Sequence, residues 1–365
     1  MSYKKPQDNP KMYLPNEYES YINSDLVIFA YQGDFKSVKN ETVKQKHNLK
    51  CLEAGLIIAV EKGYSEIVSF LLNGGISPNL RNRPQQTLLY RAAFFGYDKI
   101  VNSLLKAGAD PRIEIEMGSL CFPSPYLSPS YAVTISIERN QFEVYKVMMK
   151  YMYINKQLDQ TLVSKIVYLL TNHGYPNETL RILKSDLSID PKNKFIISAL
   201  HKALDDTYLD VAEIMINKGV LFDGSFGTLS GTPLKKALEK ANIPTLKFLI
   251  EKGVSLKCSE LNGITPLVLA VKFGSIEIVK MLIDAKVELS IPFISKVFKH
   301  PDFDIYETAL SFAIRKGYKE IAKILIDVGA ELPPPPKSKK LSNKSPFQFA
   351  NSDSGNSEDN FFDPN

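Results

Sequence analysis

Cysteine is scarce in this chain of 365 residues. It has three, Cys51, Cys121 and Cys258, which are far apart and odd in number. A disulfide framework needs paired cysteines, usually closely spaced in a short secreted chain. The sequence therefore argues against such a framework and favours a reducing compartment.

Histidine and the short motifs of common active sites are also lacking. The chain has four histidines, none of them at a catalytic or metal-ligand spacing. It contains no Cys-x-x-Cys, no His-Glu-x-x-His and no Gly-x-x-x-x-Gly-Lys-Ser/Thr run. We therefore expect no catalytic residues, no metal site and no cofactor.

Long apolar runs are absent too. No stretch of about 18 apolar residues occurs, and residues 1–23 lack the apolar centre of a signal peptide, so we expect neither a membrane span nor a leader. The formal net charge of +5 is mild, and charges of both signs are spread along the chain. A nucleic-acid partner is therefore not expected.

What the chain has instead is a recurring pair of short helices, clearest in residues 87–111. Gly96 separates the two helices and Gly108 ends the second, because glycine enters the left-handed conformation without a Cβ penalty. The apolar positions of the second helix recur at helical spacing: Ile100, Val101, Leu104 and Leu105. One such pair cannot bury its apolar stripe alone, so it needs neighbours like itself.

The pair does repeat, most often at steps of 33 or 34 residues. The positions equivalent to Gly96 fall in one register: Gly33, Gly63, Asn140, Gly174, Thr207, Ala241, Gly274 and Gly317. Nine units therefore fit, with two insertions of about ten residues. Two units are weak: the first has only Val38 at an expected apolar position, and the fifth has Glu178 and Thr179 where two apolar residues belong.

A period of 33 residues with this pattern resembles the ankyrin repeat. The family's Thr-Pro-Leu-His-x-Ala run, in which threonine caps the first helix and proline suits its first turn, is matched at 265–270 and 232–237 except for the histidine. His201 occupies the family's histidine position, which implies that its ring ties neighbouring repeats together. The resemblance covers about 24–332 and implies an all-α ankyrin-repeat solenoid of about nine helix-turn-helix repeats with short hairpin loops.

Three kinds of segment depart from the repeat. Residues 1–23 predict an N-terminal arm, which either caps the first repeat or is free. The proline-containing insertions near 112–130 and 288–305 predict long loops. Residues 333–365, rich in Pro and Lys and then acidic, predict a disordered tail. Within it Lys337–Lys344 is either a nuclear-import or anionic-surface motif or a solvated linker.

The fourth and fifth repeats are the least typical, and one stretch of them is rich in aromatic residues and methionine. Its members are Tyr145, Met148, Met149, Tyr151, Met152 and Tyr153. Such a cluster either packs the core at an irregular junction or forms an adaptable binding surface, because methionine side chains adjust to many partners.

The resemblance implies that a protein partner binds the concave face, made by the hairpin tips and the outward side of each first helix. Carried onto this sequence, the candidate residues are Arg81, Arg83, Arg91, Phe94, Phe95, Phe122, Tyr126, Lys272, Phe312 and Arg315. Guanidinium forks and aromatic rings suit an acidic, partly extended protein segment, although the arginines could instead only solvate the hairpins. We expect Phe94 to be exposed, and we expect neither Arg91 nor Phe94 to lie in the core between repeats.

The sequence therefore predicts a monomeric, intracellular, non-enzymatic scaffold for protein–protein interaction. Its bias toward Lys, Asn and Ile resembles proteins of AT-rich genomes, including intracellular bacteria and large viruses, which implies delivery into a host cell; Lys337–Lys344 would allow nuclear entry. The alternative is an effector or toxin-like enzyme with an activity in the atypical region 111–186, where Cys121 is a candidate nucleophile.

Overall fold

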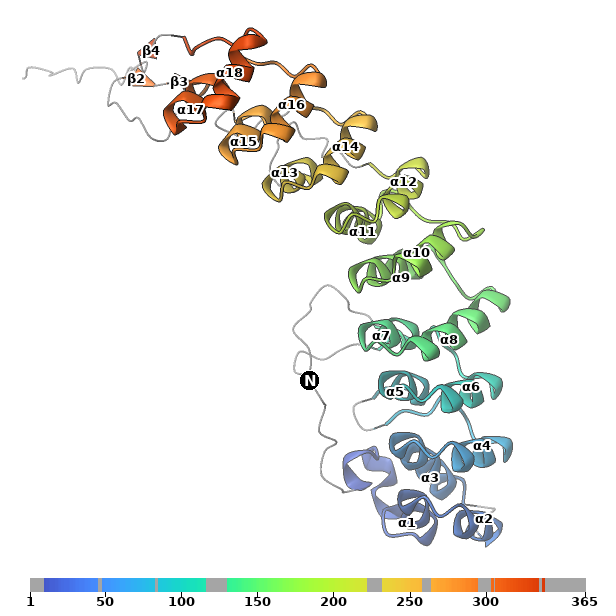
Figure 1. The fold of residues 1–365 in the computed structure, drawn as a ribbon. Helices are drawn as coiled ribbons and strands as arrows, with labels where there is room; N and C mark the ends of the chain where they lie inside the picture. The colour runs from blue at the N-terminus through green and yellow to red at the C-terminus, as the bar shows by residue number, and fades with distance from the viewer. Residues whose placement is uncertain are drawn as a thin grey trace, which may run out of the picture. The chain divides into compact units, whose positions relative to one another are not determined.

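The chain folds as a series of antiparallel helix pairs in the computed structural model (Figure 1). The structure describes residues 10–44, 48–82, 85–115, 130–221, 232–257, 264–294, 303–304, 306–334 and 337–338. Nine helix pairs lie in this part of the chain, so the predicted all-α architecture is confirmed. Among the same residues, no helix is both long and apolar enough to cross a bilayer.

Each pair consists of a first helix and a second helix. The first helices are α1 (Asp25–Gln32), α3 (Leu49–Lys62), α5 (Leu88–Phe95), α7 (Ala132–Glu138), α9 (Gln160–Asn172), α11 (Lys194–Asp205), α13 (Pro233–Glu239), α15 (Pro266–Lys272) and α17 (Ala309–Lys316). The second helices are α2 (Phe35–Lys44), α4 (Ser65–Asn73), α6 (Asp98–Lys106), α8 (Phe142–Ile154), α10 (Pro176–Leu183), α12 (Leu209–Asn217), α14 (Ile243–Glu251), α16 (Ile276–Asp284) and α18 (Lys319–Asp327).

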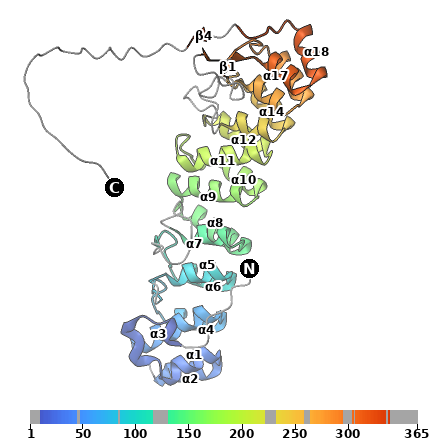
Figure 2. The same ribbon diagram turned by 90° about the vertical axis from the view of Figure 1, so that its left-hand side faces the viewer.

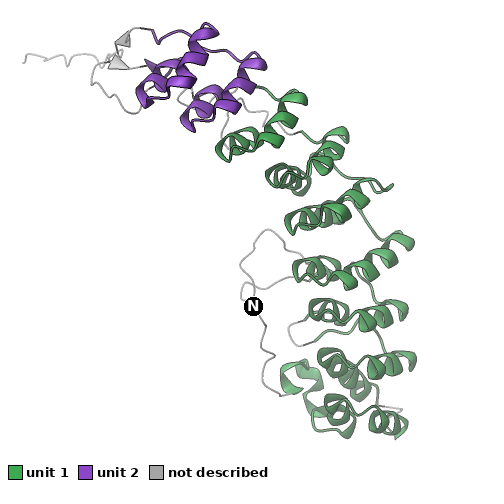
Figure 3. Ribbon diagram, viewed as in Figure 1, with its two compact units in different colours: residues 1–258 green, residues 259–365 purple. Residues whose placement is uncertain are grey.

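The chain divides into two compact units, Met1–Cys258 and Ser259–Asn365, and each is described by itself (Figure 3). In the first unit, each first helix packs on the first helix of the next repeat, and the second helices form a parallel row (Figures 1 and 2). The core lies between the two rows and is made of small and branched apolar side chains such as Ala59, Ala92 and Leu104. The second unit repeats this arrangement with α15 to α18.

Local sequence explains where the helices begin and turn. The side chains of Thr87, Thr232, Thr265 and Thr308 each accept a hydrogen bond from a backbone N–H of the first turn, which caps a first helix. The turn between the two helices has a positive φ in every repeat, including 57° at Asn140, 62° at Thr207 and 49° at Ala241. The register predicted from the turn positions is thus the register of the structure.

The two weak repeats form regular pairs because their polar residues are satisfied. In α10 the side chain of Thr179 is fully buried, and its hydroxyl donates to the carbonyl oxygen of Tyr175 at 3.0 Å. In α2 the buried Glu41 carboxylate accepts a hydrogen bond from Lys44 at 2.8 Å. A polar residue therefore replaces an apolar one where it can bond within its own helix.

Hairpin connections precede several first helices. Arg81 and Thr87 form a single antiparallel bridge before α5, and Ile115 and Ser130 form one before α7. In the second unit β1 (Phe293–Ile294) pairs with β3 (Tyr306–Glu307) before α17, and β2 (Phe303–Asp304) pairs with β4 (Lys337–Ser338). Both predicted insertions therefore start and end at a hairpin base; residues 116–129, 295–302 and 305 lie outside the described residues.

At the N-terminus two short 3-10 helices, η1 (Pro10–Met12) and η2 (Asn16–Tyr21), precede α1, and η2 packs on α3. Leu14 and Tyr18 are buried, and the Tyr18 hydroxyl donates to Glu53 at 3.0 Å. Residues 10–21 thus cover apolar surface of the first repeats, as a cap does. Residues 1–9 and most of the tail after Pro334 lie outside the described residues.

Candidate functional site

The predicted partner-binding residues lie mainly on the outward side of the first helices, which we call the first-helix face. In the first unit its most ordered polar group is centred on Glu61 of α3, whose side chain is inaccessible to solvent. Arg91 of α5 donates two hydrogen bonds to this carboxylate, Nε to Oε1 at 2.9 Å and Nη2 to Oε2 at 2.8 Å. Asn82 of the hairpin donates a third at 2.8 Å. The guanidinium fork of Arg91 is thus occupied by its own chain.

Aromatic rings surround the same arginine. The Arg91 guanidinium lies 4.6 Å from the centre of the Phe95 ring and 5.3 Å from that of Phe94. The guanidinium of Arg139, which follows α7, lies 4.0 Å from the centre of the Phe94 ring. These distances are typical of cation–π contacts. Repeats two, three and four are therefore linked by one chain of charges and rings.

The prediction that Phe94 is exposed is wrong. Its side chain is only 9% exposed, because the ring packs between Arg91 of its own repeat and Arg139 of the next. The expectation that neither Arg91 nor Phe94 lies in the core between repeats is thus wrong for Phe94, whereas Arg91 is half-buried and bonds to Glu61 of the preceding repeat. Phe95 is partly exposed and stacks on Tyr97 with ring centres 5.5 Å apart.

Of the other candidates in the first unit, only Arg81 is described. It is exposed, and its Nη1 donates to the carbonyl oxygen of Gln85 at 2.6 Å, which holds the hairpin in shape. Arg83, Phe122 and Tyr126 lie outside the described residues. The role of all these residues in binding a partner stays a prediction.

The second unit holds a similar pair on its own first-helix face. Arg315 of α17 donates to the buried Glu307 of β3, Nε to Oε1 at 2.6 Å and Nη2 to Oε2 at 3.1 Å. Its guanidinium lies 4.7 Å from the centre of the Phe312 ring. Lys272 is exposed, and the ring of Phe273 beside it is 43% exposed. Lys272 and Phe273 are thus the more accessible part of this candidate patch.

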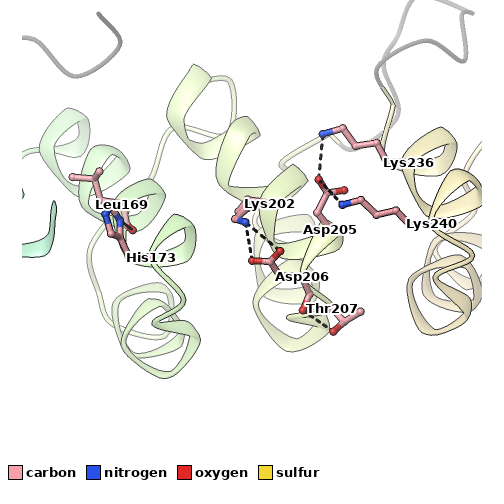
Figure 4. Close-up of polar contacts among 8 residues, drawn as sticks. All are labelled: Leu169, His173, Lys202, Asp205, Asp206, Thr207, Lys236 and Lys240. Atoms are coloured by element: carbon pink, nitrogen blue, oxygen red, sulfur yellow. Dashed lines mark hydrogen bonds and ion pairs between the residues drawn. The ribbon is translucent and has the colours of Figure 1, made fainter. Parts of the chain in front are cut away.

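The first-helix face of repeats six and seven carries a group of charges that the sequence reading did not select. Figure 4 shows Asp205 of α11 between two lysines of the next repeat, Lys236 at 3.3 Å and Lys240 at 3.7 Å. Lys202 pairs with Asp206 of its own repeat at 3.0 Å. A spacing of 31 to 35 residues between opposite charges at outward positions is the signal that could have revealed the inter-repeat pair.

Two histidines differ in their contacts. His201 makes no hydrogen bond with a described residue, and residues 222–231 before the next first helix lie outside the described residues, so the tie expected from the family position stays a prediction. Burial lowers the pKa of its ring. His173 instead bonds through Nδ1 to the carbonyl oxygen of Leu169, one turn earlier in α9, at 2.9 Å (Figure 4).

The region proposed for an alternative enzyme activity forms regular helix pairs where it is described. Burial raises the pKa of Glu138 and lowers that of Lys165, both on the first-helix face. Among the described ranges, no group of His, Cys, Asp and Glu side chains could hold a metal ion. Cys121, the candidate nucleophile, lies outside them.

The aromatic and methionine cluster is divided between the core and the surface. Tyr145, Met148 and Met152 are buried in the core of repeats four and five. Met149 and Tyr153 instead line a surface groove between α8 and α10, and Tyr153 is 48% exposed. The core interpretation therefore holds for one side of α8, and the binding-surface interpretation stays a prediction for the other.

Comparison with known families agrees with this geometry. A family model described as ankyrin repeats (3 copies) matches residues 26–115, 224–292 and 242–335, which together make up more than half of the chain. The chain therefore belongs to the ankyrin repeat family. Proteins of this family are generally modules for protein–protein interaction.

Two relatives show the extent of the likeness. A putative ankyrin repeat protein of fowlpox virus (strain NVSL) is 44% identical over 50 residues, which is 14% of this chain and 36% of that protein. An ankyrin repeat and KH domain-containing protein of Caenorhabditis elegans is 31% identical over 96 residues, which is 26% of this chain and 3% of that protein. The chain thus matches only a minor part of either relative.

Proposed function

We propose that this protein is a non-enzymatic scaffold that binds a partner protein through its first-helix face and hairpins. The observation that carries the proposal is the way in which Arg91 is held. Its fork is fixed by Glu61, and its flat face lies against Phe95, so the charge and the ring are ordered before any partner arrives. A preordered surface loses little conformational entropy on binding.

The partner we propose has an acidic, partly extended segment. Arg81 is exposed at the hairpin that precedes α5, and Arg91 and Phe95 follow on that helix. Because Arg91 already shares its charge with Glu61, the exposed Arg81 supplies the main attraction for a carboxylate. Arg83 and the insertion with Phe122 and Tyr126 belong to the same hairpins in sequence and complete the proposed surface.

Affinity capture with the full chain, followed by cross-linking and mass spectrometry, tests this proposal. Arg81→Glu should abolish capture of a partner and its cross-links to α5, because it places a negative charge where an acidic segment docks. Lys99→Glu, an exposed lysine of the second helix α6, is the matched control and should leave capture unchanged. Equal capture by both variants, or cross-links confined to second helices, would contradict the proposal.

We further propose that the protein acts inside a cell, after delivery into a host if its source is a virus or bacterium. The support is the absence of a closely spaced cysteine pair and the buried thiol of Cys51, whose pKa burial raises. A tagged full chain should then be found in the host cytosol or nucleus. Replacing Lys337, Lys339, Lys340 and Lys344 with glutamine should abolish any nuclear fraction.

A further inference from the structure

A groove on the outer side of repeats four and five is a feature that the proposed function leaves unused. It lies between α8 and α10, has a volume of about 550 Å³ and continues along the segment after α10 to Leu187. The second helices α6 and α8 pack closely, as do α10 and α12, but α8 and α10 do not. We call this feature the α8–α10 groove.

The groove exists because α8 is longer than its neighbours. It has 13 residues, whereas α6 has nine and α10 has eight, so its last turn extends beyond the end of α10. The Tyr153 hydroxyl in that turn donates to Asp186 at 2.8 Å and fixes this end of the groove.

The floor and one edge of the groove are apolar. Tyr145, Met149 and Tyr153 stand four residues apart on α8 and form one stripe, because residues four apart share a helix face. Ile182 of α10 and Leu187 in the segment after α10 line the other side of the groove. Ile154 is 66% exposed at the edge. An apolar stripe that ends at an exposed isoleucine suits an occupant wider than a small molecule.

The rim is mainly positive. Lys146, Lys150 and Arg181 line it, with Glu178 as the one acidic lining residue and Asp186 at the end of the groove. Glu178 pairs with Arg181 at 3.3 Å and Lys146 pairs with Glu143 at 3.0 Å, both exposed pairs that contribute little. Lys150 has no ion-pair partner among the described residues. The rim is therefore complementary to an acidic occupant.

We propose that the α8–α10 groove binds a short amphipathic helix of a partner protein, with its apolar face on the Met149–Tyr153 stripe and acidic residues toward Lys150. The stripe from Tyr145 to Ile154 is about 14 Å long at the rise of an α-helix, which matches a helix of about two to three turns. Laying an apolar helix face into a hydrophobic groove is a common mode of peptide recognition.

Binding of two designed helical peptides to the full chain tests the proposal by fluorescence anisotropy. Both peptides carry the same apolar face, and one has glutamate and the other lysine along its flank. The acidic peptide should bind at least about ten times more tightly than the basic one. Lys150→Glu should reverse that preference, and Ile154→Asp should weaken both peptides.

Matched controls separate the groove from general charge effects. Lys106 has the register of Lys150, ten residues after the turn, and is exposed on α6, so Lys106→Glu should leave both affinities unchanged. Ile326, 57% exposed on α18, is the control for Ile154. Ile326→Asp should likewise leave the affinity for both peptides unchanged. Since Lys150 and Ile154 are both exposed, all four variants should keep the wild-type melting temperature.

Three results would overturn the proposal. The first is no binding of either peptide up to about 1 mM, the weak end of specific affinity. The second is equal loss of binding in the Lys106 and Lys150 variants. The third is self-association of the wild type that Ile154→Asp abolishes in sedimentation, which would make a second copy the occupant. None of these results bears on Arg81, so the first-helix proposal is tested separately.

Discussion

At the scale of single residues, two arginines of this protein, Arg91 and Arg315, are held by buried acids of its own chain. Arg91 and Arg315 each form two hydrogen bonds with one carboxylate, Glu61 and Glu307, and each lies over a phenylalanine. A buried carboxylate without its partner is an uncompensated charge in a medium of low polarity. These arginines are therefore structural first, and any binding role is added to that.

Arg91→Ala should lower the free energy of unfolding by about 3 kcal/mol, because it leaves Glu61 buried with Asn82 as its remaining donor. Combining it with Glu61→Gln should cost less than the sum of the single changes, since the pair acts as a unit. Urea denaturation measures all three variants. The control is Arg112→Ala, which breaks an exposed pair with Asp110 and should cost less than about 1 kcal/mol. Similar losses in Arg91→Ala and Arg112→Ala would contradict the prediction, because the buried pair would then contribute no more to stability than the exposed pair.

At the scale of elements, the turn residue of one repeat contacts the tyrosine that follows the turn of the next repeat. A Cβ built on Gly63 would lie 2.8 Å from the ring of Tyr97, and one on Gly33 would lie 2.7 Å from the ring of Tyr64. At Asn140 the next tyrosine, Tyr175, donates a hydrogen bond to the side chain at 3.2 Å instead. Glycine at these turns therefore supplies both a positive φ and room for a ring.

Gly63→Ala should destabilise the protein more than Gly317→Ala. Both turns have a positive φ, 84° and 75°. Both variants should therefore lose about 1 kcal/mol of stability, because a Cβ disfavours the left-handed backbone conformation. Only Gly63 faces a ring; nothing lies within 4 Å of a Cβ at Gly317. Tyr97 is restrained by its stack on Phe95, so moving it adds a further loss. Thermal melting measures the difference, and equal losses would mean that the ring moves aside freely.

At the scale of the whole molecule, buried tyrosines are spread through the first unit. Burial raises the pKa of Tyr90 to about 12 and also raises the pKa of Tyr18, Tyr97, Tyr131 and Tyr145. An unfolded tyrosine ionises near pH 10. Since the unfolded chain then releases protons that the folded chain retains, stability is full below about pH 10 and falls as the pH rises toward 12.

Tyr90→Phe should reduce this alkaline loss. Tyr90 accounts for about 2 kcal/mol of it by pH 12, given a pKa raised from 10.0 to about 12. At neutral pH the variant should lose about 1 kcal/mol with the hydrogen bond to Ser130. The measurement is the free energy of unfolding from pH 8 to 12 for both chains. The control is Ile57→Val, a change at a buried residue that does not ionise. It should lower the free energy of unfolding by the same amount at every pH. If Tyr90→Phe loses stability with pH as steeply as the wild type, the prediction is refuted.

The sequence by itself determined the helix pairs, because their signals are local. An apolar stripe, a capping threonine and a turn residue all lie within one repeat, and their recurrence located α7 to α12 at 131–217, none of which the family match covers. It also indicated the hairpin insertions. It placed Arg91 and Phe94 on the outward side, with Phe95 beside them, since the helix period sets which side faces out.

Only the tertiary structure decided which of those outward residues are free. Glu61 lies 30 residues before Arg91, and Arg139 lies 45 after Phe94, so their contacts depend on how successive repeats stack. The same holds for the α8–α10 groove, which arises from the unequal lengths of two helices that are neighbours only in space. The burial and pairing of a side chain depend on two surfaces that come into contact. The sequence of a single repeat specifies only one of these two surfaces.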